Sequence, residues 1–322
     1  MSYGQDTLIE ELVKIQPRTI VVITSGNAVA MPWLNKVPAL IQNWYTGSHG
    51  ALALANVLSG DVNPSGKTVF SYAKELTDYP AHQYGLPSYP GVMPEDMPKV
   101  FSANLNPYDN SLERKNSKTQ ELKNSNNDWN PSSAYLLANA DKIKKSIPAS
   151  LTTANLNTDF DALKHNGRGN EAQVYAEDIL VGYRYFDTKK KPVLFPFGYG
   201  LSYTTFKYGK ATASATTISD NGTITFTVPV TNTGKVAGKE VVQLYIGDDK
   251  ASVVRPTKEL KAFAKVALQP GETKNVSLTI KADDLKFFDE TAHAWKVEPG
   301  TFKAYIGASS ADIKSTVAFS YK

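Results

Sequence analysis

The apolar positions near the start of the chain follow two different periods. Within 6–16 they recur every three or four residues, which predicts an amphipathic helix with Asp6 or Thr7 at its N-cap and Pro17 at its end. The next run, Thr19-Ile20-Val21-Val22-Ile23-Thr24, is continuous rather than alternating. Continuous β-branched runs are typical of strands buried on both faces of a parallel sheet. We therefore predict a helix followed by a fully buried strand.

The alternation of strands and helices continues to residue 77. The pattern predicts a second strand over 39–44, a helix over 51–58, and a third strand over 68–70. Strands that alternate with helices indicate an α/β layer built on a parallel sheet. A segment with only two or three strands cannot easily bury both faces of such a sheet. We therefore expect residues 1–77 to be a partial α/β sandwich layer that needs a packing partner.

Residues 78–170 show no sustained period. They are rich first in Tyr and Pro and then in Asn, Ser and Lys, a composition typical of a long, polar, partly disordered insertion. Residues 134–146 carry a helical pattern inside it. Residues 171–205 return to aromatic, apolar and glycine residues, and we interpret them as a connector to a further domain.

The last segment, 206–322, alternates apolar and polar residues as half-buried strands do. Turn signals such as Gln269-Pro270-Gly271-Glu272 separate the alternating runs. The predicted strands cover 223–228, 241–246, 260–266, 274–280, 301–306 and 316–321. Strands of this length with regular turns predict an all-β sandwich of the fibronectin III or immunoglobulin type. The predicted fold class is thus a piece of a parallel α/β sheet followed by an all-β sandwich.

The composition narrows the classes of function. The chain has 322 residues, a formal charge of +4 and basic residues spread along its length, which disfavours a nucleic-acid partner. It has no cysteine, which excludes disulfides, thiolate metal sites and a cysteine nucleophile. The four His are scattered without metal-ligand spacing, so we predict no metal and no cofactor. No apolar run approaches the ~20 residues that span a bilayer, and the start does not resemble a signal peptide.

Three groups of motifs are distinctive. The first ends in Trp44-Tyr45-Thr46-Gly47-Ser48-His49-Gly50 and Gly60-Asp61-Val62-Asn63-Pro64-Ser65-Gly66-Lys67. The second joins Val181-Gly182-Tyr183-Arg184-Tyr185-Phe186 to Phe195-Pro196-Phe197-Gly198-Tyr199-Gly200-Leu201-Ser202-Tyr203-Thr204. The third is Arg255-Pro256-Thr257-Lys258-Glu259-Leu260 with Leu268-Gln269-Pro270-Gly271-Glu272-Thr273. In order and spacing they resemble the C-terminal portion of family 3 glycoside hydrolases of the β-glucosidase type.

This resemblance implies half of an α/β sandwich domain, a connector and a fibronectin type III-like domain. It also implies a retaining glycosidase, which needs two carboxyl groups about 5 Å apart. In the family, an Asp nucleophile lies on a preceding barrel, and a Glu acid/base often lies just before the helix that corresponds to 6–16. We therefore expect both catalytic carboxylates to be absent from this chain and the isolated chain to be inactive.

The resemblance further implies a carbohydrate substrate, a β-glucoside or a related oligosaccharide, and the N-terminal barrel as a partner. It suggests a periplasmic or secreted protein, which fits a sequence whose leader and true N-terminus lie upstream. An alternative is a non-catalytic module that binds carbohydrate or protein, because a fold alone does not specify a function. A third interpretation is an incomplete gene product without activity of its own.

Few residues of the chain are candidates for a site. Glu177 is a weak catalytic candidate because it precedes the Gly182-Tyr183-Arg184 string, although a structural ion pair with Arg184 or a turn-capping role is the simpler interpretation. His49, Trp44 and Tyr45 follow a predicted parallel strand, where α/β sheets often bind ligands. We predict these three to lie near the substrate. For His49 and Trp44, packing is the competing interpretation.

Overall fold

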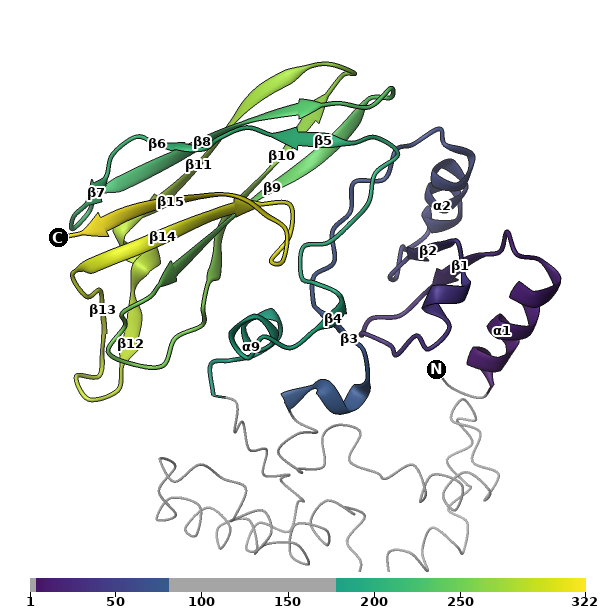
Figure 1. Ribbon diagram of the computed structural model, residues 1–322, viewed down its shortest axis with the longest axis horizontal. Helices are drawn as coiled ribbons and strands as arrows, with labels where there is room; N and C mark the ends of the chain where they lie inside the picture. Colours follow the sequence, from purple (N-terminus) through teal and green to yellow (C-terminus); the bar gives the residue numbers. More distant parts are fainter. Residues whose placement is uncertain (1–3, 81–177) are drawn as a thin grey trace, which may run out of the picture. The chain divides into compact units, whose positions relative to one another are not determined.

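The computed structural model describes residues 4–80 and 178–322 (Figure 1). The chain divides into two compact units, one formed by Met1–Leu76 with Ile179–Lys322 and the other by Thr77–Asp178. Most of the predicted insertion, its helix over 134–146 and Glu177 lie outside the described residues. No helix of the described part is long and apolar enough to cross a membrane.

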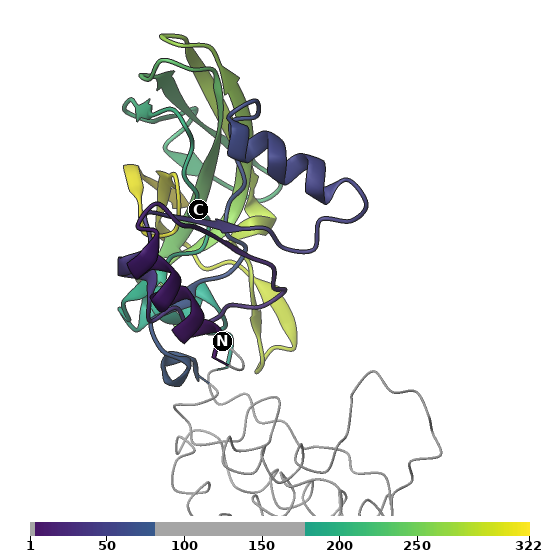
Figure 2. The same ribbon diagram turned by 90° about the vertical axis from the view of Figure 1, so that its right-hand side faces the viewer.

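The α/β part begins with α1 (Gln5–Ile15), β1 (Ile20–Ile23), the short 3-10 helix η1 (Leu34–Lys36), β2 (Ala39–Gln42) and α2 (Gly50–Ser59). β1 and β2 pair in parallel, with Ile20 opposite Ala39. These elements confirm the two predicted helices and the piece of parallel sheet. The helices α1 and α2 stand apart from each other in two perpendicular views (Figures 1 and 2). A sheet of only two strands is marginally stable by itself. Its stability therefore depends on other segments that pack against it.

The prediction that β1 is buried on both faces was wrong for this chain. Val21 and Ile23 are buried, whereas Ile20 is 48% exposed and Val22 36% exposed. The buried pair packs into a small core around Trp33, Met31 and Tyr72. The other face borders an apolar groove between β1 and α1, so the continuous apolar run reflects a surface that the described residues do not cover.

The start of α1 also differs from the prediction. The helix begins at Gln5, after Gly4 in the left-handed region, and no side chain caps it. The carboxylate of Asp6 instead accepts a hydrogen bond from the indole Nε1 of Trp33 at 2.8 Å. Because Trp33 is fully buried, its N–H needs an acceptor inside the protein. Asp6 thus ties the helix to the small core.

The third predicted strand was also misplaced. Residues 68–70 form no strand, and the next strand is β3 (Tyr72–Ala73), which pairs antiparallel with β4 (Val193–Phe195). The backbone of Thr68 pairs instead with the connector. Its N–H donates to Tyr199 O at 2.7 Å, and its carbonyl accepts from Gly198 N at 2.8 Å. Contacts from distant sequence therefore decided the conformation of this apolar run.

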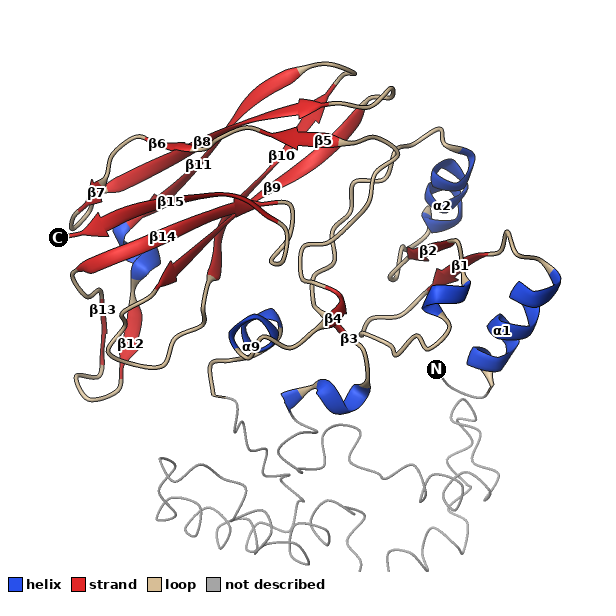
Figure 3. Ribbon diagram, in the orientation of Figure 1, coloured by secondary structure: helices blue, strands red, loops and turns tan. Residues whose placement is uncertain are grey.

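The C-terminal part is a two-sheet sandwich whose strands dominate Figure 3. One sheet has the order β10-β9-β14-β15-β7 and the other β11-β8-β5, with β6 also paired to β8. The bounds are β5 (Phe206–Tyr208), β6 (Thr212–Ala213), β7 (Thr217–Ile218), β8 (Thr223–Asn232), β9 (Gly238–Asp248), β10 (Glu259–Leu268), β11 (Thr273–Lys281), β14 (Gly300–Gly307) and β15 (Ile313–Tyr321). All six predicted strands are present, each extended by a few residues, which confirms the predicted all-β sandwich.

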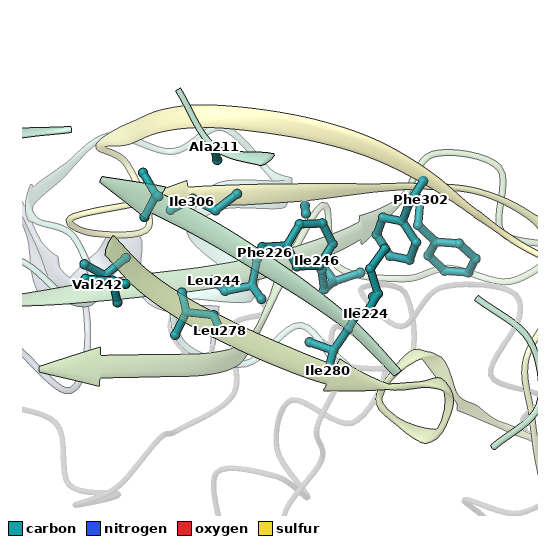
Figure 4. Packing of buried hydrophobic residues seen from close by; sticks show 14 of the residues in the cluster. Ala211, Ile224, Phe226, Val242, Leu244, Ile246, Leu278, Ile280, Phe302 and Ile306 are labelled. Carbon is teal, nitrogen blue, oxygen red and sulfur yellow. The ribbon is translucent and has the colours of Figure 1, made fainter. Parts of the chain in front are cut away.

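The sandwich core follows directly from strand alternation. In β8, Ile224, Phe226, Val228 and Val230 point inward and are at most 1% exposed. They meet side chains of the opposite sheet such as Leu244 (Figure 4). Outward positions carry Thr pairs between strands, for example Thr225 with Thr279 at 2.8 Å. Burying each large apolar side chain contributes about 1.5–3 kcal/mol, so this cluster is the main source of the sandwich's stability.

The described residues also form several smaller elements. The 3-10 helices are η2 (Leu76–Asp78) and η3 (Ala282–Leu285), and the connector forms α9 (Tyr183–Thr188). A separate hairpin joins β12 (Phe287–Asp289) to β13 (Ala294–Lys296). Sequence patterning did not predict β12 or β13, because each has only three residues and too few alternations to register.

Candidate functional site

Trp44, Tyr45 and His49 lie in the loop that follows the carboxyl end of β2. The loop 24–27 follows β1 and the loop 43–49 follows β2. Asn43 N donates to Ile23 O at 2.7 Å, and Gln42 Nε2 donates to Ser25 O at 2.9 Å. These bonds hold the two loops side by side at the edge where α/β sheets commonly bind ligands.

Tyr45 is a largely exposed residue of the loop after β2. Its side chain is 77% exposed, and its ring lies against Gly26 of the neighbouring loop. A Cβ atom built on Gly26 would come within 2.9 Å of Tyr45 Cε2, so the glycine is needed for this contact. The ring therefore has one side supported by the first loop and most of its surface open to a ligand.

Trp44 adopts a backbone conformation that is rare for a bulky residue. Its φ is 52°, in the left-handed region where an aromatic residue is strained. The structure shows the strand ending at Gln42, two residues before the predicted end. Such strain persists only where surrounding contacts over-determine it, and it concentrates at functional sites. One such contact is the edge-to-face packing of its ring on Phe70, with centroids 5.3 Å apart.

An aromatic series continues from this contact into the unit. The centroid distances are 5.1 Å from Phe70 to Tyr72, 5.9 Å from Tyr72 to Phe195 and 5.2 Å from Phe195 to Tyr199. Aromatic pairs at such distances contribute about 0.5–1.5 kcal/mol each beyond burial. Trp44 is therefore held in place by Phe70, which the series links to rings of the connector, and its packing does not exclude a role at the loop edge.

His49 occupies the N-cap position of α2. Its carbonyl accepts a hydrogen bond from Ala53 N at 3.0 Å, while its side chain forms no capping bond. The residue is exposed. The adjacent Gly50 is buried against Thr46. A Cβ atom at this position would lie 1.9 Å from Thr46 Oγ1, so no larger residue fits without a shift. The loop is thus tightly built, with the imidazole left open to solvent.

The two loops cannot carry out glycoside hydrolysis by themselves. Residues 24–27 and 43–49 include no Asp or Glu, whereas retaining hydrolysis needs two carboxyl groups. Glu177 lies outside the described residues, and Arg184 forms an ion pair with Glu259 at 3.1 Å. Over 4–80 and 178–322, no cluster of three or more His, Asp or Glu could hold a metal ion. The loops offer aromatic rings, hydroxyls, amides and an imidazole, which suit binding.

The connector helix α9 is anchored to the sandwich. The Tyr183 hydroxyl accepts from Leu260 N at 2.7 Å, and Lys258 Nζ lies 2.7 Å from Asp187 Oδ2. Burial raises the pKa of the Asp187 carboxyl, and the nearby Lys258 ammonium opposes that rise. These bonds link the segment around the second sequence motif to the Arg255–Leu260 part of the third.

Two known family models match separate parts of the chain. The "Glycosyl hydrolase family 3 C-terminal domain" matches residues 1–110, and the "Fibronectin type III-like domain" matches residues 240–310. Beta-glucosidase BoGH3A of Bacteroides ovatus is 44% identical over 321 residues, covering all of this chain and 33% of the relative. Thermostable beta-glucosidase B of Acetivibrio thermocellus is 34% identical, covering 96% of this chain and 30% of the relative.

Solved structures agree with the sequence relatives. The beta-glucosidase from Kluyveromyces marxianus in complex with glucose superposes with a TM-score of 0.68 at 31% identity, covering 99% of this chain and 29% of that one. DesR, a beta-glucosidase from Streptomyces venezuelae in complex with D-glucose, gives a TM-score of 0.70 at 30% identity, covering 99% of this chain and 30% of that one. An α/β piece, an aromatic connector and a fibronectin-like sandwich thus define a class, the non-barrel portion of a glycoside hydrolase.

The chain matches the C-terminal part of glycosyl hydrolase family 3 beta-glucosidases. It spans about a third of the length of the curated relatives that it matches.

Proposed function

We propose that this chain is the C-terminal part of a retaining, β-glucosidase-like hydrolase that acts on terminal β-linked sugars. The observation that carries the proposal is the 44% identity over the whole chain to one third of a Bacteroides ovatus beta-glucosidase. In this proposal both catalytic carboxyl groups come from the N-terminal portion of the longer enzyme, which fits strand-end loops that carry no Asp or Glu. The isolated chain is therefore inactive as a glycosidase.

In this proposal, the loops after β1 and β2 form one wall of the sugar site. Tyr45 offers an exposed ring, His49 an exposed imidazole, and Trp44 a strained position fixed by Phe70. Aromatic surfaces with a few polar groups are the usual lining of small-molecule sites. Glu177 remains a weak catalytic candidate, and its substitution becomes informative only if the isolated chain hydrolyses a glucoside.

The apolar groove between α1 and β1 is the docking surface for the N-terminal portion of the same enzyme. Leu8 is 58% exposed and Leu12 46%, and they line the groove together with Ile20 and Val22. The relatives are about three times longer than this chain, so they contain polypeptide that can cover the groove. A barrel-bearing partner would complete the sheet and bury all four side chains.

The proposed domain organisation has four segments. Residues 1–77 form the half α/β sandwich, 78–170 the insertion, 171–205 the connector and 206–322 the fibronectin type III-like domain. The start of β5 at Phe206 supports the last boundary, and the pairing of β3 with β4 ties the first segment to the connector.

A chimera tests the proposal. The matching third of the Bacteroides ovatus beta-glucosidase is replaced with this chain, and hydrolysis of p-nitrophenyl β-glucoside is compared with that by the isolated 322-residue protein. We expect turnover by the chimera and none by the isolated chain, because loss of a catalytic carboxylate costs several orders of magnitude. Circular dichroism of both proteins shows that each is folded. Turnover by the isolated chain would refute the proposal and make Glu177→Gln the next variant.

A further inference from the structure

The β12–β13 hairpin presents two aromatic rings to solvent. Phe288 and Trp295 lie directly opposite each other across the strands, with ring centroids 5.7 Å apart and planes at 70°. Phe288 is 47% exposed and Trp295 66% exposed. Figure 1 shows the hairpin beyond the ends of the large sandwich sheets. A cross-strand aromatic pair stabilises a hairpin by only about 0.2–1 kcal/mol. This small gain in stability does not explain why two large apolar rings are exposed to solvent.

The opposite face of the hairpin holds these rings in place. Phe287 is 8% exposed, and the guanidinium of Arg255 lies 5.4 Å from its ring centroid. Lys296 pairs with Asp289 on the same side, and its Nζ lies 5.3 Å from the Phe287 centroid. The Asp289 carboxylate also accepts the N–H of Thr291 at 2.9 Å, which fixes the turn. The aromatic pair is therefore preorganised, which lowers the entropic cost of binding a ligand.

The size of the exposed surface decides between classes of partner. Phe and Trp expose 150–250 Å² when fully uncovered, so the observed fractions amount to about 250 Å² in total. A stable protein interface buries about 800 Å² on each partner, far more than this pair supplies. A sugar ring is of the right size, because its apolar C–H face can cover one indole face. Exposed Glu290 and His293 in the turn supply hydrogen-bonding groups for its hydroxyls.

We propose that Phe288 and Trp295 form an accessory binding surface for β-linked gluco-oligosaccharides, with one pyranose ring stacked on Trp295. The choice of β-linked glucose rests on the proposed function, while the surface itself rests on the hairpin geometry. The surface uses neither the strand-end loops nor any catalytic carboxylate, so the isolated chain should bind the oligosaccharide. It would hold a polysaccharide near the enzyme.

Binding of cellohexaose and laminarihexaose to the purified 322-residue protein, measured by isothermal titration calorimetry, tests this proposal. We expect at least one of the two to bind and Trp295→Ala to weaken it by about tenfold or more. Trp295→Phe, which keeps a ring, should lose less. Phe263→Ala is the matched control, because Phe263 is a 67% exposed aromatic residue on β10, and it should bind within about twofold of the parent.

Thermal unfolding of each variant separates a lost contact from a lost hairpin. Absence of binding by the parent protein at millimolar oligosaccharide overturns the proposal, as does equal binding by Trp295→Ala. An equal loss in Phe263→Ala overturns it too, since the effect would not be specific to the pair. No catalysis is measured, so failure here is distinct from failure of the chimera to hydrolyse a glucoside.

Discussion

Lys67 and Glu240 form an ion pair across 173 positions of sequence, with Nζ and Oε1 3.3 Å apart. The side chains are 13% and 6% exposed. The Tyr208 hydroxyl donates to the same Oε1 at 2.9 Å, and Lys67 also donates to Gly200 O at 3.2 Å. The lysine that ends the Asn-Pro-Ser-Gly-Lys turn therefore joins the α/β part to β9 of the sandwich. Burial and the neighbouring Glu240 carboxylate raise the pKa of Tyr208, so this phenol stays protonated and donates.

Removing Lys67 should destabilise the unit more than removing the pair. Lys67→Met leaves the Glu240 carboxylate buried without its cation, and we expect a loss of about 3–5 kcal/mol in the free energy of unfolding. The double variant Lys67→Met/Glu240→Gln should recover part of that loss, because no charge is then buried. Urea unfolding of both variants gives the coupling energy. Lys265→Met, on an exposed position of β10, is the control and should change stability by under about 0.5 kcal/mol.

Substitutions in the apolar groove between α1 and β1 should affect stability differently in the isolated chain and in the chimera. In the isolated chain Leu8 and Leu12 are about half exposed, so Leu8→Ala and Leu12→Ala should cost little there. In the chimera with the Bacteroides ovatus enzyme they should each cost about 2–5 kcal/mol, the usual loss for a buried leucine. Val21→Ala is the control, because Val21 is buried within this chain and should destabilise both proteins. Equal, small effects of the leucine variants in both proteins would argue against a docked N-terminal portion.

The sandwich should lose stability in acid partly through Asp289. The Lys296 ammonium, together with the backbone N–H of Ala292, holds the pKa of Asp289 below its ordinary value of 3.8. A carboxyl with a lowered folded pKa contributes stability above its unfolded pKa, and the contribution is lost as the pH falls through the folded value. We expect the urea midpoint to fall on acidification below about pH 4, and to fall less steeply in Asp289→Asn. Glu290→Gln, in the same turn, is the matched comparison. An unchanged slope in Asp289→Asn would contradict the assignment.

The strand-end loops should affect catalysis more than stability. In the chimera, we expect Tyr45→Ala and His49→Ala to lower kcat/KM by about tenfold or more, while urea midpoints change little, because both side chains are exposed. Trp44→Ala should lower both, since the Phe70 contact is lost as well. Thr7→Ala, an exposed position on α1, is the control. Wild-type kinetics for the Tyr45 and His49 variants would remove these residues from the proposed sugar site.

The alternation of apolar residues was sufficient to predict the sandwich. Each long strand has one face toward the core, so the period of two in β8 and β11 is visible in the sequence itself. The helix over 6–16 and the strand at 39–44 were predicted for the same local reason. The run at 68–70 failed because its partner, Tyr199, lies more than a hundred residues away. Local propensity could not show that an apolar run would pair with the connector instead of joining a sheet.

The order of the motifs along the chain was thus sufficient to predict its two-part architecture and its family resemblance. Turn residues, strand periods and glycine positions are local signals that can be recognised in the sequence. The exposed face of β1, the strained Trp44 and the buried pair of Lys67 with Glu240 were decided by tertiary contacts. The same holds for the hairpin that turns Phe287 inward and Phe288 outward. Burial and charge pairing depend on which distant segments meet, and a linear pattern does not contain that information.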